Sequence, residues 1–257
     1  MAEDDAVLAV EGLTVTFGGV RAVDDLAFSI APGRLAGLIG PNGAGKTTCI
    51  DALTGFVPYD GRVTLDGVAL EGVPPHHRAR RGLVRTFQHV ELFDDLDVLG
   101  NLEVAATRPR WWWPLADLVA PDRASARAGV GDVVDLLDLT DVLHRSPPEL
   151  SEGTRKLVGV ARALVGRPRV LLLDEPAAGL DVAESVELGT RLRRVVEQGV
   201  TVLLVDHDMD LLFSVCDEVH VIDTGRLLAS GTPAQIQRDD RVIAAYLGAA
   251  PSPGAHA

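Results

Sequence analysis

Nine consecutive residues carry the types and the spacing that bind phosphate groups. In order they are Gly40, Pro41, Asn42, Gly43, Ala44, Gly45, Lys46, Thr47 and Thr48. A glycine, four residues and then Gly-Lys-Thr form the pattern of a P-loop. Glycines permit backbone conformations that are closed to other residues, so successive N–H groups can point inward and cradle phosphate oxygens. We expect Lys46 to reach the β- and γ-phosphates of a nucleotide and the Thr47 hydroxyl to bind Mg²⁺.

Acidic and imidazole side chains that could complete such a site follow two apolar runs. Asp174 and Glu175 come directly after the run at 170–173, and His207 follows the run at 200–205. We expect Asp174 to hold Mg²⁺, directly or through water, and Glu175 to orient or activate the attacking water as a general base. His207 could hydrogen-bond the γ-phosphate. The structural alternatives are that the acids cap the next helix and that the histidine only supports its strand end.

The elements around these residues predict an α/β fold. The P-loop lies between a short apolar run at 35–39 and apolar residues at helical spacing, namely Ile50, Leu53 and Phe56. The runs at 170–173 and 200–205 are continuously apolar, as strands covered on both faces should be. Ligands of such sheets bind beyond the carboxyl ends of the strands. Lys46, Asp174 and His207 should therefore meet at one edge, together with Gln88, which ends a predicted strand.

The remaining segments predict three additions to this core. Residues 7–10, 13–17, 26–30 and 62–65 alternate as strands of an antiparallel sheet laid over the core. Residues 91–154 are mostly helical, with helices over 98–106 and 129–139. A hairpin over 219–222 and 227–229 precedes a terminal helix at 233–247, and the tail at 251–257 is expected to be disordered.

Two further clusters of distinctive side chains lie outside these motifs. The adjacent His76 and His77 point in different directions on a helix, so a metal site is improbable and a solvated or partner-facing basic helix over 76–81 is favoured. All three tryptophans are consecutive, at Trp111–Trp113. They are interpreted first as a packing plug within the helical segment, and alternatively as an apolar surface for a partner or a membrane interface.

The composition of the chain indicates its cellular compartment and the class of partner that it binds. The 257 residues carry a net charge of −13, which argues against nucleic acid as a main partner because phosphate backbones attract basic surfaces. Cys49 and Cys216 are far apart and outside any metal-ligand spacing, which favours a reduced cytosolic compartment. The acidic N-terminus does not match a signal peptide, and no apolar run approaches the roughly 20 residues of a membrane span. A membrane process would be served through a partner.

The segment Leu150–Thr154 identifies a family. Its sequence is Leu-Ser-Glu-Gly-Thr, and its serine, Ser151, lies 23 residues before Asp174. This sequence resembles the Leu-Ser-Gly-Gly-Gln signature of the ATP-binding cassette (ABC) ATPases. The order of aromatic residue, P-loop, glutamine, signature and Asp-Glu pair is also that of the family, from Phe17 to Leu247. The chain departs from the signature at Glu152 and Thr154, which leaves the hydrolysis rate open.

The resemblance implies roles for further residues. Phe17 matches the aromatic residue that stacks on adenine. Gln88 matches the residue that contacts Mg²⁺ or the water and relays to the membrane partner. Ser151 and Gly153 match the residues that bind the γ-phosphate held by a second cassette, Asp181 matches the loop that crosses the dimer interface, and His207 matches the switch histidine.

As a whole, the chain is similar to the ATPase subunits of branched-chain amino-acid importers. The stretches that carry this resemblance lie at 75–88, 174–180, 206–209 and 242–248. It implies a P-loop NTPase (RecA-like) domain over 6–250 with a helical subdomain at about 91–154, which binds ATP and Mg²⁺. The partners would be an identical or different second cassette, permease subunits and, indirectly, a substrate-binding protein. The chain would sit on the inner face of the cell membrane. Urea importers, lipopolysaccharide-export ATPases and soluble assembly ATPases are the alternatives.

Overall fold

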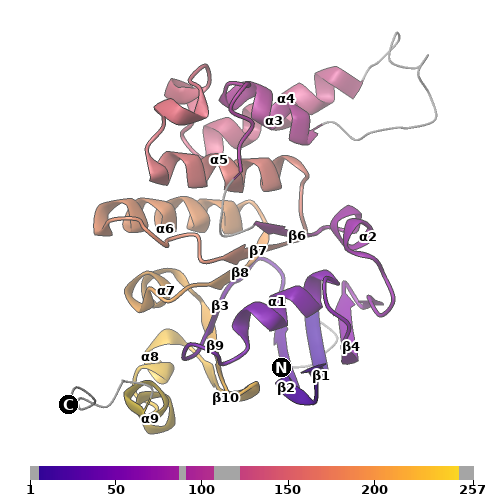
Figure 1. Ribbon diagram of the computed structural model, residues 1–257. Coiled ribbons are helices and arrows are strands. Elements are labelled where there is room, and N and C mark those ends of the chain that lie inside the picture. Colours follow the sequence, from indigo (N-terminus) through magenta and orange to yellow (C-terminus); the bar gives the residue numbers. More distant parts are fainter. Residues whose placement is uncertain (1–5, 87–90, 107–121, 249–257) are drawn as a thin grey trace.

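The structure, a computed structural model, describes residues 6–86, 91–106 and 122–248. Figure 1 shows a sheet core with helices stacked outward from it on one side and a second sheet on the other. The core sheet has six strands in the order β10-β9-β3-β8-β7-β6. Their bounds are β3 Leu35–Ile39, β6 Leu83–Thr86, β7 Val170–Asp174, β8 Thr201–Val205, β9 Glu218–Asp223 and β10 Arg226–Gly231.

The core sheet is parallel except at one edge. β3, β6, β7, β8 and β9 pair in parallel, and β10 returns antiparallel to β9 through a hairpin. The continuous apolar runs explain this, because every residue of β3, β7 and β8 is buried. Successive side chains alternate between the two faces, so Leu171 and Leu173 pack in one hydrophobic cluster, and Val170 and Leu172 pack in the other. The prediction of parallel core strands is confirmed.

The second sheet is antiparallel, as predicted, with the strand order β2-β1-β4-β5. Its strands are β1 Leu8–Phe17, β2 Val20–Ile30, β4 Asp60–Leu65 and β5 Val68–Ala69. The runs expected as two strands at 7–10 and 13–17 are one strand with irregular register around Gly12, which has a φ of 60°. This sheet shares one hydrophobic cluster with the helix that follows the P-loop and with one face of the core sheet.

Helices cover the other face of the core sheet and extend away from it (Figure 1). Between β6 and β7 lie α3 Val98–Ala106, α4 Asp122–Leu136, the short 3-10 helices η3 Thr140–Val142 and η4 Pro147–Glu149, and α5 Glu152–Val165. α6 Val182–Glu197 and α7 Met209–Val215 follow, and α8 Pro233–Ile236 and α9 Asp240–Gly248 end the described chain. α4 starts earlier than the expected helix at 129–139. It also ends earlier, because the chain turns at Asp138, whose φ is 53°.

Three expectations about helices were wrong. α1 Lys46–Thr54 ends before Phe56, which is exposed, because Gly55 takes a left-handed conformation that caps the helix. The terminal helix is divided into α8 and α9, since Asp239 accepts a hydrogen bond from the Arg241 N–H and starts a new helix. The basic helix, α2 Pro75–Arg80, is not solvated throughout. Arg78 is buried and donates to the carbonyls of residues 52, 53, 70 and 73.

Some predictions fall outside the part of the chain that the structure describes. They concern Gln88, Trp111–Trp113 and the tail at 251–257. Both cysteines, Cys49 and Cys216, are free and buried. Across the described ranges, each helix is either too short or too polar to cross a bilayer.

Candidate functional site

The P-loop joins the carboxyl end of β3 to the amino end of α1, as its motif requires. Lys46 is the first residue of α1 and is buried, with its ammonium group donating to the carbonyl oxygens of Gly40 at 2.7 Å and Pro41 at 3.1 Å. These contacts fold the lysine back over the loop. Gly43 and Gly45 have φ values of 81° and 101°, which fits the inward turn of successive N–H groups.

The strand β2 and the β9–β10 turn pack closely on the P-loop. A Cβ atom at Gly40 would lie 2.1 Å from the Ile222 carbonyl oxygen, and one at Gly45 would lie 2.4 Å from the Ala22 carbonyl oxygen. Gly225, in the β9–β10 turn, donates its N–H to the Ala44 carbonyl at 3.0 Å. Glycine is therefore required at 40 and 45 by close backbone approach, and strands far apart in sequence fix the loop.

Asp174 and Glu175 stand beside the lysine. β7 ends at Asp174, which is buried, and Glu175 follows with a φ of 48° and donates its N–H to the Val205 carbonyl at 2.7 Å. Burial lowers the pKa of Lys46, while the charges of Glu175 and Asp174 act in the opposite direction. The structure thus brings together three of the predicted site residues, and Glu175 takes a strained backbone conformation typical of functional positions.

Arg85 is a member of this site that the sequence reasoning missed. Its guanidinium donates from Nη1 to Asp51 Oδ1 at 2.5 Å and from Nη2 to Asp174 Oδ2 at 2.7 Å. The Arg85 side chain is 8% exposed. The available signal was a charged residue inside the run at 83–88, which was predicted to be a core strand ending in Gln88. A buried arginine needs carboxylate partners.

Asp206 organises the neighbouring strand end. Its buried carboxylate accepts hydrogen bonds from the backbone N–H groups of Ala177 at 2.9 Å, His207 at 2.8 Å and Asp208 at 3.0 Å. The His207 ring is 64% exposed, with Nδ1 3.5 Å from Asp206 Oδ1. The sequence reasoning singled out His207, whereas the structure shows that Asp206 fixes the loop which follows Glu175.

The signature residues form a second group, at the starts of α5 and α6. Ser151 caps α5, where its hydroxyl accepts from the Thr154 N–H at 3.2 Å, and Asp181 caps α6, where it accepts from the Glu184 N–H at 2.8 Å. Both capping residues are exposed. Gly153 lies against α6, since a Cβ there would be 2.9 Å from Glu184 Oε1. We call Ser151, Gly153, Asp181 and Glu184 the signature group.

Lys156 connects this group to the residues around Glu175. Its ammonium group donates to the Ala178 carbonyl, and burial lowers its pKa against the opposing charges of Glu152, Asp206, Glu175 and Glu184. The chain contains only two lysines, Lys46 and Lys156, and each is buried beside acidic residues.

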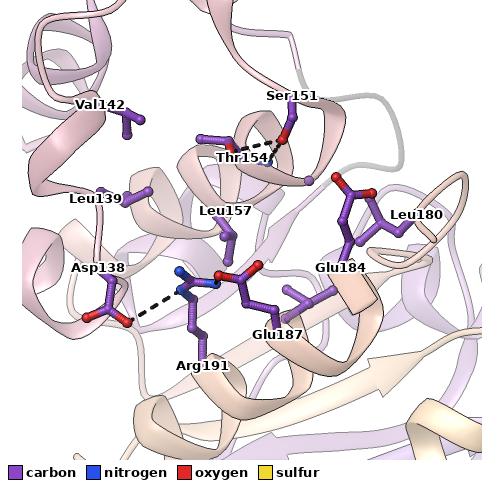
Figure 2. Close-up of a pocket in the computed structure, with 12 residues that line it drawn as sticks. Asp138, Leu139, Val142, Ser151, Thr154, Leu157, Leu180, Glu184, Glu187 and Arg191 are labelled. Atoms are coloured by element: carbon purple, nitrogen blue, oxygen red, sulfur yellow. Dashed lines mark hydrogen bonds and ion pairs between the residues drawn. The ribbon is translucent and has the colours of Figure 1, made fainter. Parts of the chain in front are cut away.

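Behind the signature group lies a small cavity of about 90 Å³ between α5 and α6. In Figure 2, Arg191 lies between Asp138 and Glu187 at one end, and Ser151 and Thr154 lie at the other. Arg191 Nη1 is 2.5 Å from Glu187 Oε1, and Arg191 Nε is 3.8 Å from Asp138 Oδ2. The aliphatic wall includes Leu139, Val142, Leu157, Leu180 and Leu188.

The donor set around the P-loop fits a magnesium nucleotide. Thr47 is exposed at the start of α1, and Asp174 lies at the end of β7 with one carboxylate oxygen engaged by Arg85. Among the described residues, no three histidine, cysteine or acidic side chains are grouped as a metal cage. Mg²⁺ is usually bound through one or two protein oxygens together with phosphate oxygens and water, so Thr47 and Asp174 would suffice as its protein ligands. Phe17 is 49% exposed at the end of β1.

Comparisons with known proteins give the same picture. Residues 23–178 match the family described as "ABC transporter", and residues 226–251 match "Branched-chain amino acid ATP-binding cassette transporter". The chain is 42% identical to the high-affinity branched-chain amino acid transport ATP-binding protein BraF of Pseudomonas aeruginosa, over 95% of this chain and 98% of that protein. It is 39% identical to the corresponding LivG protein of Escherichia coli, with the same coverage.

A solved structure agrees with the fold. The ADP conformation of an ATP-binding cassette of an ABC transporter superposes with a TM-score of 0.84 at 28% identity, covering 95% of this chain and 99% of that one. The sequence, the arrangement of the P-loop and Asp174, and these similarities lead to one conclusion: the chain belongs to the ABC transporter family, as an ATP-binding cassette that couples ATP hydrolysis to transport.

Proposed function

We propose that this chain is the ATP-hydrolysing subunit of an importer for branched-chain amino acids. The observation that carries the substrate assignment is the match of the C-terminal segment, 226–251, to the branched-chain amino-acid cassette family. That segment forms β10, α8 and α9, which lie outside the P-loop, the acid pair and the signature. Its similarity is therefore independent of the motifs that all such ATPases need. The full-length likeness to BraF and LivG supports the same substrate class.

The residues around Lys46 support hydrolysis at the γ-phosphate. The P-loop N–H groups and Lys46 would hold the phosphates, and Thr47, Asp174 and Gln88 would hold Mg²⁺, which neutralises developing charge when bound. Glu175 would orient a water whose oxygen attacks the γ-phosphorus. The bond to the β–γ bridging oxygen breaks, ADP leaves, and Glu175 accepts the water's proton. His207, which projects from the end of β8, would hydrogen-bond the γ-phosphate.

A second cassette would complete the site. Ser151 and Asp181 are exposed at adjacent helix starts and contact groups within their own first turns. In a head-to-tail pair, Ser151 and Gly153 of each cassette would bind the γ-phosphate held by the other, with Phe17 stacked on adenine. ATP would drive closure because it adds contacts that only the closed state makes. The partner is either a second copy or a related chain.

The outer helices support a docking role toward a permease. α3 and α4 stand beyond α5, at the end of the molecule farthest from β10 (Figure 1). Permease subunits would contact this layer and the segment that contains Gln88, so that the cassette sits on the inner face of the cell membrane. A substrate-binding protein would take part only indirectly, through the permease.

The substrate class can be tested by uptake in the native cells. The gene is deleted, and uptake of radiolabelled leucine, isoleucine and valine is compared with uptake of urea. We expect uptake of the three amino acids to fall and to return with the wild-type gene but not with the Glu175→Gln gene. Normal amino-acid uptake together with lost urea uptake would contradict the proposal.

The partners can be tested by purification. The tagged Glu175→Gln protein is isolated with ATP in mild detergent, and the co-purifying chains are identified by mass spectrometry. A polytopic permease and a second cassette are expected. Recovery of soluble proteins alone, with the dimer trapped, would favour an assembly ATPase.

A further inference from the structure

We propose that Arg85 is a positioning residue for the magnesium ion. It holds the Asp174 carboxylate in the orientation that binds the metal and ties that carboxylate to the P-loop helix. The inference rests on the proposed hydrolysis at the P-loop and adds to it a residue outside the P-loop, the signature and the acid pair.

The sheet register places Arg85 beside the metal ligand. β6 and β7 are parallel, and Arg85 pairs with Leu172. Residues that pair across neighbouring strands point to the same face of the sheet, so Arg85 and Leu172 share a face. Residues i and i+2 of a strand share a face, so Leu172 and Asp174 point to the same side. Leu172 belongs to the hydrophobic cluster that contains Ile50 and Leu53 of α1. The guanidinium therefore lies between the end of β7 and the P-loop helix.

The guanidinium joins two carboxylates from different elements. One nitrogen, Nη2, is 2.7 Å from Asp174 Oδ2, and the other, Nη1, is 2.5 Å from Asp51 Oδ1 on α1. Asp174 is as buried as Arg85, with both side chains 8% exposed. The planar fork of arginine can hold two partners at once in a fixed geometry, which the single ammonium of a lysine cannot reproduce.

This arrangement leaves the other oxygen of Asp174 available to a metal. Arg85 engages Oδ2, so the carboxylate cannot rotate freely and Oδ1 keeps one direction. Asp51 lies four residues after Thr47 on the same helix, so the guanidinium also sets the spacing between Asp174 and the predicted hydroxyl ligand. Carboxylates that bind metals are usually held by such hydrogen bonds, and losing the partner typically costs about 10- to 100-fold in metal affinity or activity.

Two effects of Arg85 on the metal oppose each other. Its positive charge repels a cation nearby, so a purely Coulombic effect predicts tighter metal binding when Arg85 is removed. The orienting effect predicts weaker binding. We expect orientation to dominate, because the guanidinium occupies one oxygen of Asp174 and leaves the other in place. The direction of the change therefore distinguishes a positioning residue from a simple structural ion pair.

The test measures metal binding without turnover. Arg85→Met is introduced into the full-length Glu175→Gln protein, and Mn²⁺, which stands in for Mg²⁺, is titrated into the ATP complex while its electron paramagnetic resonance signal is followed. The half-saturating Mn²⁺ concentration is expected to rise about 10- to 100-fold. ATP affinity in EDTA should stay within about twofold of the parent, because the phosphate cradle is intact. Arg62→Met, at an exposed arginine of β4, is the matched control.

Further variants keep the test decisive. Arg85→Lys and Asp51→Asn should each give a smaller rise, since each retains part of the bridge, and they replace Arg85→Met if circular dichroism shows that it does not fold. Mn²⁺ binding that is unchanged or tighter would overturn the proposal, as would an equal loss of ATP affinity in EDTA. If ATP binding by the parent protein itself showed no metal dependence, the hydrolysis proposal would fail before any variant was measured.

Discussion

The residues around the P-loop and those of the signature group are held in the fold in different ways. The side chains of Lys46, Arg85 and Asp174 are buried, and their partners come from the loop itself, α1 and the neighbouring strands. Ser151 and Asp181 are exposed and contact residues within three positions of themselves. Long-range contacts within one chain hold Arg85 and Asp174, and Lys46 bonds to the loop just before it. The second set, Ser151 and Asp181, caps the starts of α5 and α6, and both side chains are exposed to solvent.

This difference separates what one chain can do from what requires two. A phosphate cradle must desolvate charge and therefore needs a rigid, internally paired surrounding. A surface that engages a second molecule's nucleotide must stay accessible until the two molecules meet. Changes in the P-loop residues should therefore affect nucleotide binding by the monomer. Changes in the signature group should affect only steps that depend on the dimer.

The largest effect is expected for Glu175→Gln. Removing the general base should lower ATP turnover by about 10²- to 10⁴-fold. ATP affinity should be retained, because the phosphate contacts are unchanged, and the closed dimer should accumulate in size-exclusion chromatography with ATP. Turnover at the wild-type rate would remove Glu175 from the mechanism.

Lys46→Ala should have the next largest effect. Hydrogen bonds to charged groups contribute about 1.5–3 kcal/mol, which corresponds to about 10- to 150-fold in affinity. ATP affinity of the monomer, measured by calorimetry, should fall by this amount at every protein concentration. Arg62→Met serves again as a control at an exposed position. Intact affinity would contradict the phosphate-cradle interpretation.

Ser151→Ala should discriminate between the two sets of residues. The monomer's ATP affinity should be unchanged, while turnover at saturating ATP should fall about tenfold through loss of one bond to charged phosphate. Losing the cap should also reduce the free energy of unfolding by about 1 kcal/mol. Asp97→Ala, which removes the acceptor of the Gly100 N–H at the start of α3, is the matched control and should affect stability without affecting turnover. A fall in the ATP affinity of the monomer would contradict the distinction between the P-loop residues and the signature group.

Glu152→Gln should have the smallest effect. The carboxylate at the start of α5 would face the γ-phosphate of a second cassette, and like charges about 4 Å apart in water repel by about 1 kcal/mol. Dimer formation with ATP should therefore strengthen by up to about fivefold, as measured by analytical ultracentrifugation. Asp141→Asn, at an exposed acid of η3, is the control. Weaker dimerisation would show that Glu152 contributes a contact of its own.

Much of the cassette could be predicted from local sequence signals. The P-loop spacing, the continuous apolar runs of β7 and β8 and the alternation of the antiparallel strands depend on residues that are near each other in the chain. So do the caps at Ser151 and Asp181, since each bonds an N–H three residues ahead. The errors arose at element ends, as with Phe56, where a single residue such as Gly55 stops the helix.

Only the tertiary structure decided which charged side chains are buried and what they contact. Arg78, Arg85, Lys156 and Asp206 belong to ordinary-looking segments, and their partners lie up to 89 residues away in sequence, as for Arg85 and Asp174. A buried charge is tolerated only where the fold supplies its counter-charges or hydrogen-bond partners, and no local pattern records those. The sequence by itself predicted where phosphate binds. The packing of β6 against β7 and α1 determined how Asp174 beside it is held.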